Sequence, residues 1–150
     1  MSFPRIVSSG AWTGYFPVAP GTFASVFALG IGALLLWLSP YLLLAAAILA
    51  TFGGIWAIGQ LKDALHDPGW VVIDEFAGQF IALLGLATLS WTGVALAFAL
   101  FRFFDIVKPG PVGWADRMGG AVGVMLDDVI AGIFAGIIVF AARMIFPGYI

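Results

Sequence analysis

The longest uncharged stretch of the chain, residues 6–61, most limits what this sequence can fold into. A bilayer core of about 30 Å needs roughly 20 apolar helical residues for one crossing, so the stretch is long enough for two. Ser39 and Pro40 interrupt it where a turn between two helices is needed. We therefore expect two membrane-spanning helices here, near residues 22–38 and 41–61.

The composition also favours a membrane over water as the solvent of this chain. Charged residues make up 9% of the sequence, hydrophobic residues make up 63%, and the mean hydropathy is +1.12. Soluble proteins carry about 25% charged residues, which a domain of this length needs to cover its surface. The net charge of −2 and the lack of a basic run argue against a nucleic-acid partner. Because the chain has no cysteine, thiolate metal sites and cysteine nucleophiles are excluded.

Three further apolar segments follow, and we expect helices near residues 71–89, 94–107 and 124–146. The predicted fold class is therefore all-α: a small polytopic membrane helix bundle with about five apolar helical segments, or four if the first is re-entrant. It forms a single membrane-embedded domain over residues 1–150. Residues 1–21, which are aromatic-rich and nearly uncharged, are expected to lie at the membrane interface.

Alternating crossings would gather most of the charged residues at one membrane face. With five spans, the segments around Arg5, residues 62–75 and residues 102–128 lie together, and they hold five of the six basic and all eight acidic residues. Only Arg143 falls on the opposite face. Because basic residues favour the cytoplasmic side, we expect the charged face to be cytoplasmic.

Six ionisable residues lie inside the expected helices, where insertion of a charged side chain costs about 2.5–3.5 kcal/mol. Short carboxylates cannot reach the headgroups as lysine and arginine do, so these side chains need partners within the protein. The alternative is that they are helix-end residues near the headgroups, or carboxylates that cap helix starts. The six are Asp74, Glu75, Arg102, Asp105, Asp127 and Asp128.

Two pairs of adjacent carboxylates, Asp74–Glu75 and Asp127–Asp128, each open an expected helix. Adjacent helical residues diverge by about 100°, so we expect one member of each pair to face a shared site. Several carboxylates in a partly dry crevice repel one another unless a cation is bound. Oxygen ligands without cysteine or a second histidine favour Mg²⁺, with Mn²⁺ as the other candidate. All four carboxylates are therefore candidate metal ligands.

Cationic side chains at the same face complete a pattern typical of phosphoryl transfer. Arg102, Lys108 and Arg117 could neutralise phosphate oxygens while a water attacks in line. Arg102 and Asp105 are three residues apart on one helix, so they could also simply pair. His66 is the only histidine, and a structural role is as compatible with its position as a chemical one.

The ordered set of these motifs resembles the phosphatidylglycerophosphatase A family. The resemblance extends over most of the chain, from about Pro20 to Gly136, and departs from the family pattern at residues 119–122 and at Gly110. It rests on Pro20-Gly21-Thr22 with Ser25, His66-Asp67, Asp74-Glu75-Phe76 with Gly78, Phe101-Arg102 with Asp105, Lys108-Pro109, Asp116-Arg117, and the run from Gly123 to Asp128 with Ala131-Gly132.

The resemblance implies a Mg²⁺-dependent enzyme of the bacterial inner membrane. Such an enzyme removes the terminal phosphate of the phospholipid phosphatidylglycerophosphate, giving phosphatidylglycerol in phospholipid biosynthesis, with its active site on the cytoplasmic face. The predicted catalytic residues are Asp67, Asp74, Glu75, Asp127 and Asp128. The predicted substrate-binding residues are Thr22, Ser25, His66, Arg102, Asp105, Lys108 and Arg117.

The identity of the group that activates the attacking oxygen stays open. Asp67 or one of the ligating carboxylates would accept the proton of the attacking water. Formation of an aspartyl-phosphate is a second possibility. Thr22 and Ser25 would donate hydrogen bonds to the phosphate at a helix N-terminus.

Two other classes of protein fit parts of the same pattern. Carboxylates within spans also bind permeating cations, so a cation transporter or channel component is the main alternative. A transporter would place them near the bilayer midplane, often at broken helices, whereas here we expect them at helix ends on one side. A structural assembly subunit would leave the cost of inserting these carboxylates unexplained.

Overall fold

The computed structural model describes all residues from 1 to 150 and contains helices but no strands, which confirms the all-α prediction. In chain order the elements are α1 (Phe3–Ser8), the 3₁₀ turn η1 (Thr13–Tyr15), α2 (Pro20–Leu38), α3 (Pro40–Gly59), the 3₁₀ turn η2 (Lys62–Ala64), α4 (Ile73–Leu83), α5 (Trp91–Val107), α6 (Pro111–Asp116) and α7 (Gly120–Ile145).

Three of these helices, α2, α3 and α7, are long and apolar enough to cross a membrane. The predicted count of about five apolar spans is not confirmed, because α4 has 11 residues and α5 has 17. At 1.5 Å per residue, α4 covers about 17 Å, roughly half of a bilayer core. The helix ends at Leu83 because the amides that follow it bond to carbonyl oxygens only three residues back. Gly85 donates to Ala82, and Leu86 donates to Leu83.

The predicted turn between the first two spans is confirmed at Ser39 and Pro40. Ser39 adopts an extended backbone, and its hydroxyl oxygen accepts a hydrogen bond from the Tyr41 amide at 3.2 Å. Pro40 opens α3 at a position where its missing N–H has no helical partner to lose. The preceding helix α2 is one unbroken segment of 19 residues.

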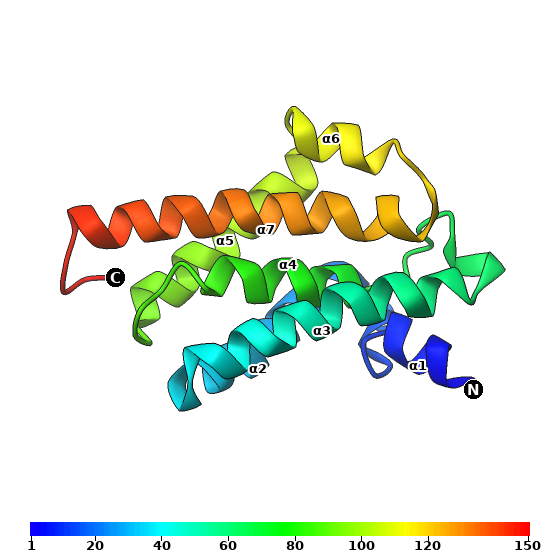
Figure 1. The fold of residues 1–150 in the computed structure, drawn as a ribbon, viewed down its shortest axis with the longest axis horizontal. Coiled ribbons are helices and arrows are strands. Elements are labelled where there is room, and N and C mark those ends of the chain that lie inside the picture. The colour runs from blue at the N-terminus through cyan, green and yellow to red at the C-terminus, as the bar shows by residue number, and fades with distance from the viewer.

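The long helices alternate in direction, so that one end of the bundle collects the charged segments. Figure 1 shows the starts of α2, α4 and α7 and the end of α3 in its right-hand half, where α1 also lies, and α5 runs from the left toward this end and finishes beside α6. Arg143, in the last turn of α7, lies at the other end. The gathering of charges predicted from the sequence is therefore present in the fold.

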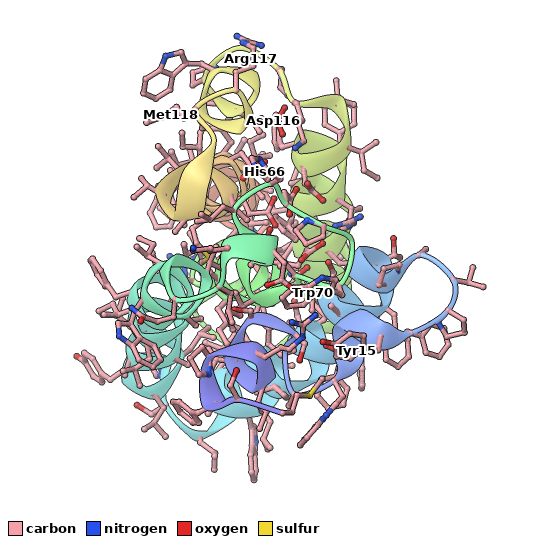
Figure 2. All side chains as sticks on the ribbon, turned by 90° about the vertical axis from the view of Figure 1, so that its right-hand side faces the viewer. Tyr15, His66, Trp70, Asp116, Arg117 and Met118 are labelled. Carbon is pink, nitrogen blue, oxygen red and sulfur yellow. The ribbon has the colours of Figure 1, made fainter.

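The N-terminal segment lies against the loop that follows α3. Arg5 donates hydrogen bonds to Asp63 at 2.8 Å and to the Tyr15 hydroxyl at 3.0 Å, and its guanidinium lies 4.4 Å from the centre of the Trp70 ring. Tyr15 stacks on Trp70, and Figure 2 labels the two residues near each other. Trp12 is 56% exposed, which suits the interfacial position expected for this segment.

Small residues allow α4 to lie in the middle of the bundle, in contact with α2, α3, α5 and α7. A Cβ atom added to Gly78 would overlap the Phe101 ring, and one added to Gly132 would overlap the Gly78 carbonyl oxygen. The backbones of α4 and α7 therefore approach more closely than side chains would permit, as is common between membrane helices. This contact sets the distance between the first turns of α4 and the site-bearing part of α7.

The α4–α7 contact predicts the effect of adding bulk at Gly132. Gly132→Leu should push α7 away from the Gly78 backbone and lower the free energy of unfolding by about 1–3 kcal/mol, as overpacking usually does. The control is Gly53→Leu, because nothing lies within 4 Å of a Cβ at Gly53. Thermal unfolding in detergent should show a lower midpoint for the first variant only, and equal midpoints would contradict the packing account.

Candidate functional site

Three carboxylates meet at the charged end of the bundle. Asp74 and Glu75 lie in the first turn of α4, Asp128 lies about two turns into α7, and one oxygen from each is within 4.8 Å of the other two. Asp74 is 6% exposed, Asp128 is 3% exposed, and Glu75 is half-buried. We call these three residues the carboxylate cluster.

Each member of the carboxylate cluster has a buried oxygen without a hydrogen-bond partner: Oδ1 of Asp74, Oε2 of Glu75 and Oδ2 of Asp128. Buried polar atoms without partners are costly, and three converging anionic groups repel one another. A divalent cation would satisfy the open oxygens and remove the repulsion. The residues present therefore fit a hard cation with oxygen ligands.

The cluster differs in one respect from the expected arrangement of the two carboxylate pairs. One member of each pair was expected to face the site, and this is wrong for Asp74 and Glu75, because both reach it. The reason is Gly21 on α2: a Cβ there would overlap Glu75 Oε1, so the missing side chain makes room for the longer carboxylate. The expectation does hold for the pair on α7, where only Asp128 joins the cluster.

Asp127, predicted as a metal ligand, lies outside the carboxylate cluster. Its Oδ2 accepts a hydrogen bond from Lys108 Nζ at 2.8 Å, and its Oδ1 accepts one from the Asp128 amide at 3.0 Å. The start of α7 also differs from the prediction, because the helix begins at Gly120 and Asp127 is not in its first turn. Neither carboxylate pair caps its helix, since the N-cap residues are Val72 and Gly119.

Arg102 links the end of α5 to the start of α2. Its Nη1 donates to Ser25 Oγ at 3.3 Å and pairs with Asp105, while its Nη2 donates to Thr22 Oγ1 at 3.3 Å. Ser25 in turn donates to the Gly21 carbonyl oxygen at 2.8 Å. Four predicted substrate-binding residues are therefore brought together, and the predicted Arg102–Asp105 pair is present.

Lys108 links the end of α5 to α6 and α7. It ends α5 with a left-handed backbone (φ 48°), and its Nζ contacts both Asp116 and Asp127. Burial alone would lower the pKa of Lys108, but the hydrogen bonds to these two carboxylates raise it, so the amine stays protonated. The pairing of Asp116 with Lys108 was not predicted from the sequence. The two residues are eight positions apart with a loop between them, so no helical spacing rule relates them.

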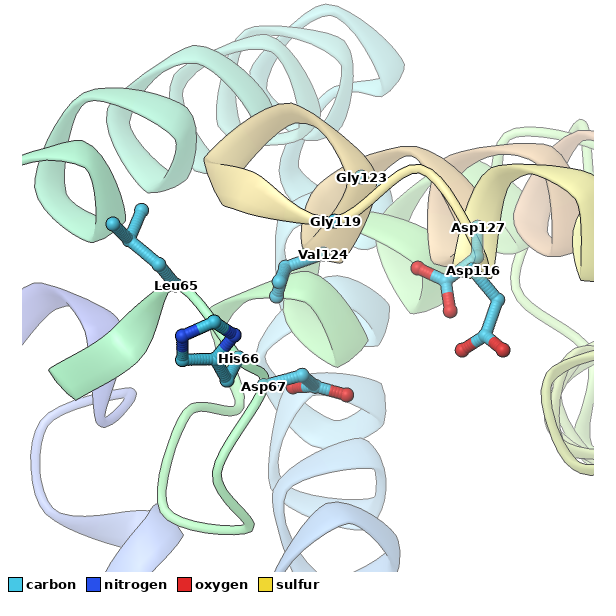
Figure 3. Close-up of a pocket in the computed structure, with 8 residues that line it drawn as sticks. All are labelled: Leu65, His66, Asp67, Asp116, Gly119, Gly123, Val124 and Asp127. Atoms are coloured by element: carbon cyan, nitrogen blue, oxygen red, sulfur yellow. The ribbon is translucent and has the colours of Figure 1, made fainter. Parts of the chain in front are cut away.

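A cavity of about 310 Å³ opens beside Lys108 and its carboxylate partners. His66 and Asp67, from the loop after α3, form one wall, and Asp116 and Asp127 form another (Figure 3). The remaining lining residues are Leu65, Gly119, Gly123 and Val124. His66 lines the cavity, but its side chain makes no hydrogen bond that would indicate a role. Its part in substrate binding therefore stays a prediction.

Asp67 brings to this cavity a carboxyl group from the loop before α4, and its pKa is shifted from the usual value. Partial burial, followed by the negative charge of Asp127, raises the pKa of Asp67 to about 6 against the opposing effect of Lys108. Its backbone is left-handed (φ 50°), a conformation that aspartate tolerates better than most residues. A carboxyl group with a pKa close to the ambient pH is suited to accept and release protons.

Arg117, predicted to bind substrate, is not brought to the site. Asp116, the last residue of α6, contacts Lys108, whereas Arg117, which caps the end of α6, points outward (Figure 2). Arg117 forms no ion pair. The angle of about 100° between neighbouring helical residues explains why only one of the two faces the site.

The fold and the site together indicate a small membrane protein, with three helices long and apolar enough to span a bilayer and with carboxylates and cations at one end of its helix bundle. The family model of phosphatidylglycerophosphatase A matches residues 6–143. The chain belongs to the phosphatidylglycerophosphatase A family, a family of phosphatase enzymes.

Relatives of similar length support this membership. Phosphatidylglycerophosphatase A of Haemophilus influenzae is 39% identical, over 93% of this chain and 88% of the relative. The protein of the same name from Escherichia coli is 38% identical, over 93% and 84%. A Bacteroides thetaiotaomicron protein provisionally named phosphatidylinositol-3-phosphatase is 40% identical, over 95% and 94%. No solved structure matches the chain.

The carboxylate cluster predicts that divalent cations stabilise the fold. Adding Mg²⁺ or Mn²⁺ at about 100 times the dissociation constant should stabilise the protein by about 2.7 kcal/mol, seen as a higher unfolding midpoint. Gly21→Ala should reduce this gain, because its methyl group displaces the Glu75 carboxylate. The matched control on the same helix is Gly30→Ala, where the added Cβ meets nothing within 4 Å.

The cation account fails if the metal shifts the midpoint of wild type and of Asp128→Asn equally. Such a result would mean that the cations act elsewhere on the protein or on the detergent. A loss of the shift in Asp128→Asn alone, with an unchanged shift in Gly30→Ala, would support the cluster as the site.

Proposed function

We propose that this protein hydrolyses the terminal phosphate ester of phosphatidylglycerophosphate, giving phosphatidylglycerol and phosphate. The observation that carries the proposal is the set of three carboxylates, each with an unpartnered buried oxygen, at the same end of the bundle as Arg102 and Lys108. Membership of the family and the names of two relatives support the choice of substrate. A bundle end lies at headgroup depth, which is where a lipid phosphate is found.

Asp74, Glu75 and Asp128 would hold one Mg²⁺ ion, or Mn²⁺ in its place, because hard cations prefer carboxylate oxygens. When bound, such an ion polarises a phosphate oxygen and offsets the charge that develops during phosphoryl transfer. Asp127 would serve a different purpose, since its carboxylate is engaged by Lys108. We assign it the positioning of that lysine.

The two cations would both contact the phosphate. Arg102 is pre-oriented by Thr22, Ser25 and Asp105, so little side-chain entropy remains to be lost when it binds an anion. Lys108 is fixed by carboxylates at the edge of the cavity and stays protonated. Together they would neutralise oxygens of the transferred group.

Asp67 would act as the general base. The cavity that it lines is large enough for water, and its carboxylate can accept a proton when it is ionised. The water oxygen then forms a bond to phosphorus, the bond from phosphorus to the glycerol oxygen breaks, and that oxygen takes a proton from solvent in the cavity. Free phosphate and the lipid alcohol are the products.

The position of the carboxylates favours this proposal over a cation transporter. They lie near one end of the bundle, and the helix that carries Asp128 is continuous from Gly120 to Ile145. Transporters commonly bind ions at the bilayer midplane between broken helices. We further propose that the charged end faces the cytoplasm of a bacterial cell in the inner membrane, because most basic residues gather there.

Substitutions at the adjacent carboxylates should separate their roles. Asp128→Asn should abolish release of phosphate from phosphatidylglycerophosphate, because it removes a member of the carboxylate cluster. Asp127→Asn should lower kcat by about 10–100-fold, as loss of a supporting partner does, and should leave the Mg²⁺ dependence unchanged. Phosphate release by purified protein, measured against Mg²⁺ concentration, provides the comparison.

The same assay decides the substrate and the class of protein. Phosphatidylinositol 3-phosphate should be hydrolysed more slowly than phosphatidylglycerophosphate, and a reversed preference would replace the proposed substrate. Full activity in the presence of a chelator would contradict the metal assignment. Cation uptake into vesicles without any release of phosphate would favour the transporter.

The pKa of Asp67 predicts an acidic limb in the activity profile. Below about pH 6 the carboxyl group is protonated and cannot accept a proton from water, so kcat/KM should fall as the pH is lowered through this value. Asp67→Asn should remove the limb and lower the plateau by about 10²–10⁴-fold. Asp63→Asn, which changes a carboxylate paired with Arg5, is the control. An identical limb in both variants would contradict the assignment of the base.

A further inference from the structure

The outer face of α2 carries a shallow apolar hollow of about 390 Å³. Its lining residues are spaced three and four apart, so they form one stripe on the helix, opposite the buried Ala24, Ser25 and Ala28. The stripe consists of Phe23, Val26, Phe27, Gly30, Ile31 and Leu34. We call it the α2 hollow.

Gly30 gives the α2 hollow its depth, because a Cβ added there would meet no atom within 4 Å. The aromatic walls on the headgroup side are held in place by other parts of the protein. The Phe23 ring stacks on Phe16 with centroids 4.0 Å apart, and the Phe27 ring packs edge-on against Phe76 of α4. The shape of the hollow is therefore fixed on its headgroup side and does not depend on free side chains alone.

The α2 hollow begins at the residue that follows Thr22, one of the proposed phosphate-binding residues. Phe23 directly follows Thr22, whose hydroxyl accepts the hydrogen bond from Arg102 at 3.3 Å, and both Thr22 and Phe23 are exposed. From Phe23 to Leu34 the helix rises about 17 Å, which is roughly half of a bilayer core. A lipid with its phosphate at Arg102 would thus have its chains beside this stripe.

A second apolar hollow, between α4 and α7, does not begin next to such a residue. It is lined by Ile81, Gly85, Ile133 and Gly136 among others. Of these, Ile133 is nearest in sequence to the carboxylate cluster, and it lies more than one helical turn beyond Asp128. No cation or hydroxyl of the site adjoins it. The α2 hollow is therefore the better candidate for contact with a lipid bound at the site.

We infer that the α2 hollow seats one acyl chain of the lipid substrate while Arg102 contacts the headgroup phosphate. This inference rests on the proposed function. An acyl chain gains no hydrophobic free energy by moving from bilayer to protein, because both surroundings are apolar, so packing against fixed walls supplies the preference. The effect is to orient the lipid, which brings its phosphate ester toward the carboxylate cluster in a reactive position.

Filling the α2 hollow tests the inference without disturbing the protein core. In Gly30→Trp the indole would occupy the hollow, and in the matched control Gly53→Trp it would project from the lipid-facing side of α3, where nothing lies within 4 Å. The probes are two non-hydrolysable phosphonate analogues of the lipid, one with long and one with short acyl chains. Their affinities are measured in detergent micelles at fixed mole fraction.

The ratio of long-chain to short-chain affinity should fall about fivefold in Gly30→Trp, because the packing contacts of one chain are lost. Gly53→Trp should keep the wild-type ratio. An unchanged ratio in Gly30→Trp, or an equal fall in both variants, would overturn the inference. Phosphate release from a short-chain substrate is measured in parallel, and its absence in wild type would refute the proposed function while the binding comparison still decides the role of the hollow.

Discussion

The mutual repulsion of three clustered carboxylates is the constraint on which the rest of the structure depends. Asp74, Glu75 and Asp128 converge from two helices, and each leaves one buried oxygen without a hydrogen-bond partner. Such an arrangement is unfavourable because buried polar atoms without partners cost free energy. The chain also has few charged residues, 9% of the total, that could pair with them. Binding of the proposed cation would offset this repulsion, and the stability of the fold would then be linked to that ligand.

The surrounding contacts serve to keep this cluster in place. Gly21 leaves room for Glu75, and the close approach of Gly78 and Gly132 fixes the spacing of α4 and α7. Arg102 and Lys108 each have hydrogen-bond partners of their own, so both cations would be positioned before the proposed lipid phosphate binds. The short α4 places two of the three carboxylates at the bundle end without having to span the membrane.

The number and direction of the first helices follow from the sequence, because they depend on the lengths of the apolar segments and on the positions of the turns between them. The uncharged run of residues 6–61 predicts two spans, and the turn at Ser39 and Pro40 divides them where the structure does. The alternation of the helices then predicts which charges gather. By contrast, the early end of α4 depends on local bonding after Leu83, which the apolar pattern of that segment does not reveal.

Side-chain partnerships within the site were less predictable. The sequence shows that Asp127 and Asp128 share a location, but the choice of Lys108 as the partner of Asp127 depends on a loop conformation. The outward direction of Arg117 depends on how α6 is rotated, and the importance of Gly21 depends on the approach of Glu75 from another helix. These are three-dimensional contacts between segments far apart in the chain, for which no spacing rule exists.

Location of a bound Mn²⁺ ion by anomalous diffraction from crystals of the protein tests the central claim most directly. We predict one peak at direct ligand distance from an oxygen of each of Asp74, Glu75 and Asp128, with Asp127 still bound to Lys108. A peak beside Asp127 and Asp116, or no peak in crystals of a protein that releases phosphate in Mn²⁺, would contradict the account.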